Sequence, residues 1–415
     1  MTLIVHKYGG TSMGSPERII NVAKRIAKWA KAGHSIVVVP SAMSGETNRL
    51  LSLAAAINSN PDPRDLDMIA STGEQVSTAL LTLALKAQGI DAIGFSGWQI
   101  PIKTDNAYTK ARIESIDSEL ILANIKQNKV VVITGFQGID NEQNITTLGR
   151  GGSDTSAVAI AASIGADECL IYTDVDGVYT TDPRVVDSAK RLEQITFEEM
   201  LEMASLGSKI LQIRSVEFAG KYKVKTRVLS SLTDPLMPLE EEMKSGTLIT
   251  FEENSHMEKA VISGIAFQRD EAKITLKGVN DTPGIAAHIL KPIAQHNIDV
   301  DMIIQNQSFD GKTDFSFTVP RQELTKALEI INTEVNPKIQ ASSIISDNKV
   351  SKVSVVGVGM RSHTGLASLM FETLANENIN IQLISTSEIK ISVLIDEKYM
   401  ELAVRSLHKA FELDA

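Results

Sequence analysis

The most informative stretch of this chain is Thr147-Leu-Gly-Arg-Gly-Gly-Ser-Asp-Thr-Ser-Ala-Val-Ala-Ile-Ala161. Its three glycines allow the backbone to turn sharply and to approach a ligand closely, because no Cβ atom is in the way. Ser153 and Asp154 are typical N-cap residues, and the small apolar residues from Thr155 onward predict a helix. A glycine-rich turn before a helix N-terminus favours an anion, and Arg150 adds a guanidinium suited to a carboxylate or a phosphate. The same pattern also fits a strand-to-helix turn that binds nothing.

The composition is typical of a soluble globular protein. A chain of 415 residues predicts roughly two to four domains. The net charge of −10 argues against a general nucleic-acid binder, which needs a basic surface. There is no signal-peptide pattern and no apolar run of about 18 residues, so we expect a cytoplasmic protein without a membrane helix.

Cys169 is the only cysteine of the chain. Disulfides within the chain and cysteine-rich metal sites are therefore excluded. Its neighbours are aliphatic, which indicates a buried strand thiol and not a nucleophile.

The first half of the sequence alternates short aliphatic runs with helical patterns. This alternation predicts an α/β domain with an open, mostly parallel sheet between helices. The expected buried strands are residues 3–5, 35–39, 130–133 and 168–172, and the expected helices are residues 16–31 and 71–88. Ser15 should cap the first helix, because Pro16 stands at its first position.

The composition changes near residues 233–256, which are rich in proline and acidic residues. We therefore expect a first domain over residues 1–245 and a linker over 246–262. Beyond it the sequence repeats itself: Gly365 follows Gly284 by 81 positions, with matching order of strands and helices around each. The pattern predicts two small α+β modules of βαββα type, over residues 263–340 and 341–415.

Several polar loops follow the predicted strands, where open α/β sheets bind their ligands. Lys7 is followed by Gly9 and Gly10, a combination that suits phosphate oxygens. The spacing is not that of a Walker A loop, which argues against a P-loop kinase. Ser41 and Thr47 follow the second strand, where hydroxyls act as ligands or simply as caps.

Acidic residues stand in two further loops. Glu74 belongs to Thr72-Gly-Glu-Gln75, which should open a helix, so its carboxylate either stabilises a helix N-terminus or holds a substrate ammonium group. Asp174 and Asp176 follow the fourth strand, where paired carboxylates suit Mg²⁺ beside phosphates. Asp176-Gly177 also fits a plain turn, which leaves Asp174 as the better functional candidate.

Taken together, these loops resemble those of the aspartate kinases, within the amino-acid kinase superfamily. The resemblance covers nearly the whole chain and includes a C-terminal pair of modules similar to ferredoxin-like ACT domains. The motifs that carry it are Lys7-Tyr-Gly-Gly-Thr-Ser12, Ser41-Ala-Met43, Thr72-Gly-Glu74, Thr147-Leu-Gly-Arg-Gly-Gly-Ser-Asp154, Tyr172-Thr-Asp-Val-Asp-Gly177 and Gly207-Ser-Lys-Ile210.

The resemblance implies transfer of the ATP γ-phosphoryl group to the side-chain carboxylate of L-aspartate, on the path to lysine, threonine and methionine. It implies catalytic roles for Lys7, Asp154 and Asp174. The implied ATP-binding residues are Lys7, Tyr8, Gly9, Gly10, Ser41, Thr173, Asp174, Tyr179, Arg184, Lys209 and Ile210. The implied substrate-binding residues are Thr47, Glu74, Arg150, Gly152 and Ser153. Mg²⁺ would be carried mainly by the nucleotide, so no metal site made only of protein groups is expected.

For regulation, the resemblance implies that an amino-acid effector, lysine or threonine or both, binds between ACT modules. The implied effector residues are Asp281, Gly284, Ile285, Ala286, Asp299, Val300, Asp301, Gln305, His363, Gly365, Asn380, Ile381, Ser385 and Thr386. We expect at least a homodimer, and Met257 stands where an internal start would produce a separate C-terminal subunit.

Two alternatives remain open. One is a kinase of the same superfamily with another carboxylate or phosphate acceptor, although Glu74 and Arg150 favour an acidic amino acid. The other is an amino-acid sensor built on an inactive kinase domain, although the retained Lys7, Arg150 and Asp174 argue against it.

Overall fold

The computed structural model describes residues 2–205, 211–251, 262–307, 311–358, 360 and 365–414. The chain forms two compact units, one made mainly of residues up to 256 and the other of residues 179–190 and 257–415. The predictions for Lys209, Ile210, Met257 and His363 lie outside the described residues. No helix of the described ranges is long and apolar enough to cross a membrane.

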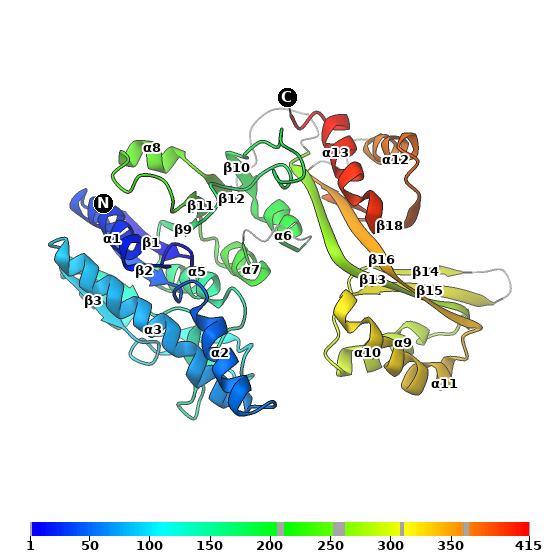
Figure 1. Cartoon of the computed structure of the whole chain (residues 1–415), viewed down its shortest axis with the longest axis horizontal. Coiled ribbons are helices and arrows are strands. Elements are labelled where there is room, and N and C mark those ends of the chain that lie inside the picture. Colours follow the sequence, from blue (N-terminus) through cyan, green and yellow to red (C-terminus); the bar gives the residue numbers. More distant parts are fainter. Residues whose placement is uncertain are drawn as a thin grey trace. The chain divides into compact units, whose positions relative to one another are not determined.

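The first unit is built on an eight-stranded sheet of order β10-β12-β11-β9-β1-β2-β6-β3 (Figure 1). Its strands are β1 (Leu3–Tyr8), β2 (Ser35–Pro40), β3 (Ala92–Phe95), β6 (Val130–Ile133), β9 (Glu168–Thr173), β10 (Gln194–Thr196), β11 (Thr226–Ser230) and β12 (Thr247–Thr250). All neighbouring strands are parallel except β11 and β12. The open, mostly parallel sheet expected from the sequence is therefore confirmed, as are its four central strands.

Helices cover both faces of this sheet. A small four-stranded sheet of order β5-β4-β7-β8 packs against α3 and α5. The helices are α1 (Pro16–Lys31), α2 (Glu46–Ile57), α3 (Pro63–Ala87), α4 (Glu119–Ile125), α5 (Gly152–Ile164), α6 (Phe197–Ser205), α7 (Ile213–Tyr222) and α8 (Leu239–Lys244). The strands of the small sheet are β4 (Ile102–Thr104), β5 (Ile113–Ile116), β7 (Gln137–Ile139) and β8 (Ile145–Thr147).

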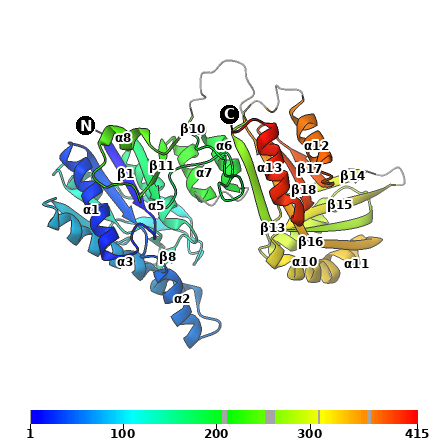
Figure 2. The ribbon, with the colours of Figure 1, turned by 45° about the horizontal axis from the view of Figure 1, so that its top comes forward.

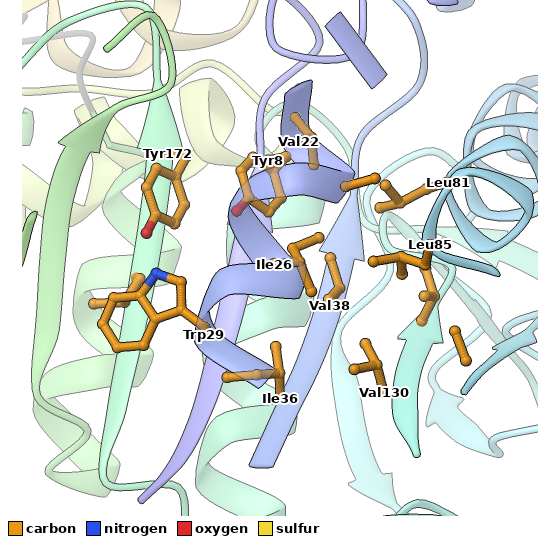
Figure 3. Close-up of a cluster of buried hydrophobic side chains, with 14 of the residues drawn as sticks. Tyr8, Val22, Ile26, Trp29, Ile36, Val38, Leu81, Leu85, Val130 and Tyr172 are labelled. Carbon is orange, nitrogen blue, oxygen red and sulfur yellow. The ribbon is translucent and has the colours of Figure 1, made fainter. Parts of the chain in front are cut away.

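The core on one face of the large sheet lies under α1 and α3 (Figure 3). Ile26 and Trp29 of α1 and Leu81 of α3 pack there on strand residues that include Val38. Across the other face, α5, α6 and α7 pack on β9, β11 and β12, with Val158 of α5 among the contacting residues. Cys169 is buried in β9, as expected, and burial raises the pKa of its thiol.

Three local predictions for this unit were wrong. The residue that caps α5 is Gly151, at φ 69°, so Ser153 and Asp154 lie inside the first turn. Helix α3 begins at Pro63, capped by Asp62, because Asp-Pro is an earlier start signal than Thr72. Glu74 is therefore in the middle of a 25-residue helix, away from the N-terminal dipole.

The predicted boundary at residue 245 was also wrong. Residues 247–250 form β12, which pairs with β10 and β11 inside the first sheet. The acidic run before it forms α8, whose Glu242 is buried against α1. In addition, residues 179–190 belong to the second unit, where Val186 packs into a core of the C-terminal repeat.

The second unit contains the βαββα pattern twice, as predicted, joined in one six-stranded sheet of order β14-β15-β13-β16-β18-β17 (Figure 2). The first repeat has β13 (Gly264–Asn280), α9 (Ile285–Gln295), β14 (Ile303–Gln307), β15 (Lys312–Val319), α10 (Leu324–Ile330) and α11 (Asn336–Ile339). The second has β16 (Ser343–Val356), α12 (Leu366–Asn376), β17 (Ile381–Thr386), β18 (Lys390–Asp396) and α13 (Met400–Ala410). The second strand of the first repeat, β14, begins at Ile303.

The two repeats share their longest strands. β13 and β16 pair antiparallel from Gly264 with Val356 to Lys277 with Ser343. Ile265, near the start of β13, packs in the core of the second repeat, whereas Ile274 packs in the core of the first. The predicted module boundary at residue 340 therefore does not separate the two cores, because the first residues of β13 pack in the core of the second repeat.

Candidate active site

Three neighbouring parallel strands, β9, β1 and β2, end at the same edge of the large sheet. Tyr8 pairs in register with Tyr172 on one side and with Pro40 on the other. The loops that follow these strands are therefore adjacent, as the sequence predicted. The Gly9 N–H donates to the Tyr172 carbonyl (3.0 Å) and the Ser41 N–H to the Tyr8 carbonyl (2.9 Å).

Lys7 lies near this edge, on β1, and points to the face covered by α5. Its ammonium forms an ion pair with the carboxylate of Asp154, in the first turn of α5. A Cβ atom at Gly9 would lie 3.6 Å from Lys7 Nζ, so the loop after β1 passes close to the ammonium. The predicted pair of Lys7 and Asp154 is thus in direct contact. The Gly9 N–H, in contrast, is used by the sheet and is not free for a phosphate.

Glu74 reaches the end of β2 from the middle of α3. Its Oε1 accepts the N–H of Ala42 (3.2 Å), and Gly73 permits this approach, because a Cβ there would lie 2.9 Å from the Ala42 Cβ. The side chain is buried, and among the described residues its Oε2 has no hydrogen-bond partner. Burial raises the pKa of this carboxyl from 4.5 to about 7. Thr47 lies in the first turn of the adjacent helix α2.

The glycine-rich turn between β8 and α5 brings Arg150 and Ser153 to this region. Ser153 lies beside the end of β6, because a Cβ at Gly135 would be 3.3 Å from the Ser153 Cβ and 2.7 Å from Val39. Arg150 is exposed, and in the part of the chain that the structure describes its guanidinium has no hydrogen bond or ion pair. Gly152 could not be larger, since a Cβ there would lie 2.9 Å from Leu148.

Asp174 follows β9 and is exposed, with Thr173 Oγ1 donating to its carboxylate (3.1 Å). It is at the same edge of the sheet as Lys7. The structure does not bring the two side chains into contact. Asp176 lies 3.7 Å from Arg191. Two other predicted nucleotide residues, Tyr179 and Arg184, belong to the second unit, where Arg184 pairs with Asp182 (2.7 Å).

Sequence reasoning missed the residues that hold the glycine-rich turn. Asp67 of α3 accepts hydrogen bonds from Thr109 and Thr147, and Arg214 of α7 donates to the Leu148 carbonyl (2.6 Å). Gly135 was also missed. The only signal available was that Gly135 stands two residues after the end of the predicted strand 130–133.

In the second unit, the described members of the predicted effector set lie at the starts of α9 and α12, on β14 and β17, and in the loops that precede these two strands. Gly284 and Gly365 are the N-caps of these helices, at φ 92° and 108°. Asp301 is not free: its carboxylate pairs with the buried ammonium of Lys352 on β16. Gln382 likewise accepts from Lys273 of β13, so each repeat bonds to the first strand of the other.

Comparison with known proteins agrees with this architecture. The amino acid kinase family model matches residues 2–230, and the ACT domain model matches residues 274–335 and 353–411. The sequence is 60% identical over 415 residues to a protein of Pseudomonas putida named aspartate kinase, covering 100% of this chain and 98% of that one. The chain belongs to the aspartate kinase family. It is therefore an enzyme of the kinase class with ACT domains, which indicates allosteric regulation.

Solved structures of this family share the fold. The E. coli aspartokinase III structure in complex with aspartate and ADP, in the R-state, has a TM-score of 0.80 at 25% identity. The matched region covers 98% of this chain and 99% of the E. coli chain. The same E. coli enzyme in complex with lysine and aspartate, in the T-state, has a TM-score of 0.74 at 25% identity, with 99% coverage of both chains. The predicted fold class, an amino-acid kinase fold with ACT domains, is thus confirmed.

Proposed function

We propose that the chain transfers the γ-phosphoryl group of ATP to the side-chain carboxylate of L-aspartate, giving 4-phospho-L-aspartate and ADP. This would be the first step towards lysine, threonine and methionine. The E. coli relative binds aspartate and ADP, which supports the same pair of ligands here.

The observation that carries the proposal is the buried Glu74, whose Oε2 lacks a partner among the described residues. A carboxylate in such a place favours a cationic group of the substrate. It disfavours a phosphate acceptor, because two negative charges would repel each other. Glu74 therefore suits the ammonium group of an amino acid, and the exposed guanidinium of Arg150 suits its α-carboxylate. Thr47 and Ser153 are available for further hydrogen bonds.

The reaction requires charge neutralisation more than a base. The acceptor carboxylate is already ionised at pH 7, so the protein has to bring two anionic groups together. Lys7 would neutralise the transferring phosphoryl oxygens, while Asp154 holds its ammonium in place. The N-terminus of α5 adds a positive dipole end at the same point.

A nucleotide-bound Mg²⁺ fits this arrangement. Asp174 is exposed at the end of β9 and pairs with no cation in the described ranges, so its carboxylate can face the metal. The metal would supply further neutralisation of the phosphate charge. Thr173, Ser41 and Gly10 lie in the adjacent loops and would contact the nucleotide.

A hydroxylamine trap tests the proposal. The purified protein is given ATP and Mg²⁺ with aspartate, glutamate, N-acetylglutamate or UMP. Acyl phosphates are captured as hydroxamates, and UDP is measured separately, because a nucleotide product gives no hydroxamate. We expect hydroxamate with aspartate and little with the other acceptors. Absence of aspartyl hydroxamate under conditions where control kinases react would exclude the proposal. Phosphorylation of another acceptor instead would identify that acceptor as the substrate.

We further propose that lysine or threonine, or both, inhibit through the ACT domains of at least a homodimer. The lysine complex of the E. coli relative in the T-state supports this. The sequence of the two repeats differs where ligands would bind, with Asp301 opposite Gln382, so the two sites should be inequivalent. The kinase rate, measured with lysine and threonine separately and together, should fall in at least one case. A rate that is insensitive to both would exclude lysine and threonine as effectors. A separately made C-terminal subunit would appear as a second band in the natural host.

A further inference from the structure

We propose that Asp67 is a positioning residue for the amino-acid substrate: it ties the turn that carries Arg150 to the helix that carries Glu74. The inference rests on the proposed function, in which these two residues hold the α-carboxylate and the ammonium group of aspartate. Asp67 and Glu74 are seven positions apart on α3, about two helical turns, so they share one face of the helix.

The carboxylate of Asp67 is buried, with 1% of the residue exposed, and its hydrogen bonds come from two loops. From the first loop, the Thr109 N–H donates to both oxygens, at 3.0 and 2.8 Å. From the second, the Thr147 N–H donates to Oδ2 (2.8 Å) and the Thr147 hydroxyl to Oδ1 (2.6 Å). No cation pairs with Asp67 among the described residues. An ionised group buried in this way depends on these neutral donors.

Thr147 is the last residue of β8, and the turn to Arg150 begins directly after it. Thr109 adopts φ 67°, a conformation that non-glycine residues rarely adopt, and its carbonyl oxygen lies 2.9 Å from the position of a Cβ at Gly149. Asp67 therefore holds both the start of the turn and the loop that packs against its first glycine.

Arg214 of α7 supports the same turn by hydrogen bonds to backbone carbonyls. It donates to the carbonyls of Leu148 (2.6 Å) and Ala111 (2.9 Å), and the Ala111 N–H donates to the Thr147 carbonyl (2.9 Å). Residues 147 and 148 are thus fixed by hydrogen bonds, whereas the side chain of Arg150 is exposed and has no partner among the residues that the structure describes. The direction of Arg150 is set by the backbone beneath it, and Asp67 relates that backbone to the helix of Glu74.

A purely structural role would have a different signature. If Asp67 only stabilised the fold, its loss would lower stability and change the KM values for ATP and aspartate together. A positioning role predicts a selective effect on aspartate, because the turn holds Arg150 and α3 holds Glu74, whereas Lys7 is on β1. Misplacement of a binding group by about 1 Å has large kinetic effects.

The experiment compares Asp67→Asn with the wild-type enzyme. Asparagine keeps the shape, but its NH₂ group cannot accept a bond from Thr109 or Thr147. We expect the KM for aspartate to rise about tenfold, which corresponds to about 1.4 kcal/mol, with the KM for ATP changed less than about twofold. Thr147→Val removes only the hydroxyl hydrogen bond to Asp67. It should raise the KM for aspartate by a smaller factor, again with little change in the KM for ATP. It provides a second variant if Asp67→Asn does not fold.

Asp140→Asn is the matched control. Asp140 is also buried and accepts bonds from Tyr108 Oη (2.9 Å) and from the N–H groups of Glu142 (2.9 Å) and Asn144 (2.8 Å), but it does not contact the turn. It should lower the unfolding temperature without raising the KM for aspartate.

Three results would overturn the inference: equal changes in both KM values, no change in either, or the same selective effect in Asp140→Asn. Wild-type enzyme that forms no aspartyl hydroxamate would overturn the proposed function together with this inference. Hydroxamate formation by the wild type with an unchanged KM in Asp67→Asn would overturn the inference alone.

Discussion

The Lys7 ammonium on β1 pairs with the Asp154 carboxylate in the first turn of α5, and only 10% and 11% of the two side chains are exposed. This pair joins the end of a central strand to the helix that follows the glycine-rich turn. The positive charge of Lys7 is therefore held at the edge of the sheet where β2 and β9 also end.

Lys7→Ala should reduce kcat at least about 100-fold, because a preorganised charge at the transferring group is removed. The fold should persist, as judged by circular dichroism. Arg227→Ala is a matched control, since Arg227 pairs with Glu168 (2.9 Å) in the same sheet with 14% and 13% of the side chains exposed. Glu168 begins β9, at the opposite edge, so this variant should retain the wild-type kcat. A near-normal kcat for Lys7→Ala would show that Lys7 is not required for phosphoryl transfer.

Glu74→Gln should stabilise the protein at pH 8. Burial raises the pKa of Glu74 from 4.5 to about 7, so between these values the folded state binds more protons than the unfolded state. Its contribution to stability is therefore lost as the pH rises through this window. Removing the charge should raise the free energy of unfolding at pH 8 by up to about 3 kcal/mol. Urea unfolding of both proteins at pH 5 and pH 8 measures this; a variant that gains nothing at pH 8 relative to pH 5 contradicts it.

The same group predicts how aspartate binding depends on pH. Protonated Glu74 cannot offer a negative charge to an ammonium group, so the KM for aspartate should rise as the pH falls below 7. With a pKa of about 7, the rise should approach about tenfold at pH 6. The KM for ATP, measured over the same range, serves as the internal control. A KM for aspartate that is flat from pH 8 to pH 6 would show that the ammonium group is bound elsewhere.

Glu242→Ala should destabilise the first unit by about 3–5 kcal/mol, because it leaves a buried guanidinium without its partner. Glu242 pairs with Arg25 and Lys28 of α1 and accepts bonds from Trp29 Nε1 (3.1 Å) and Tyr172 Oη (3.0 Å). Chemical denaturation measures the loss.

Glu241→Ala is the control for this prediction. Glu241 is exposed in the same short helix, and surface substitutions usually change stability by less than about 0.5 kcal/mol. Similar losses in the two variants would mean that the destabilisation comes from α8 itself and not from the buried ion pairs.

Local patterns were enough to predict the central strands and the loops after them. Residues 35–39 and 130–133 are continuous aliphatic runs, and such runs form buried parallel strands. Because parallel strands end at one edge, the sequence placed Lys7 near the loops that follow the second and fourth strands. The 81-residue repeat also predicted two βαββα modules, since each unit carries its own order of strands and turns.

Predictions failed where distant partners decide the structure. Three consecutive glutamates in a proline-rich stretch are typical of a linker, yet Glu242 is buried because Arg25 and Tyr172 supply its partners. Thr72-Gly-Glu-Gln75 has the composition of a helix start, yet Gly73 is small because α3 crosses Ala42 closely.

The loop motifs, the succession of strands and helices along the chain and the two repeats could be predicted from the sequence, because they follow from local periodicity and from glycine, proline and capping residues. The tertiary structure was needed to show that β13 pairs with β16 and that burial raises the pKa of Glu74. It was also needed to show that Asp67 accepts hydrogen bonds from Thr147, at the start of the turn that carries Arg150. Burial, the pairing of distant strands and hydrogen bonds between distant segments depend on which groups surround a residue in space. That information is absent from any short stretch of the chain.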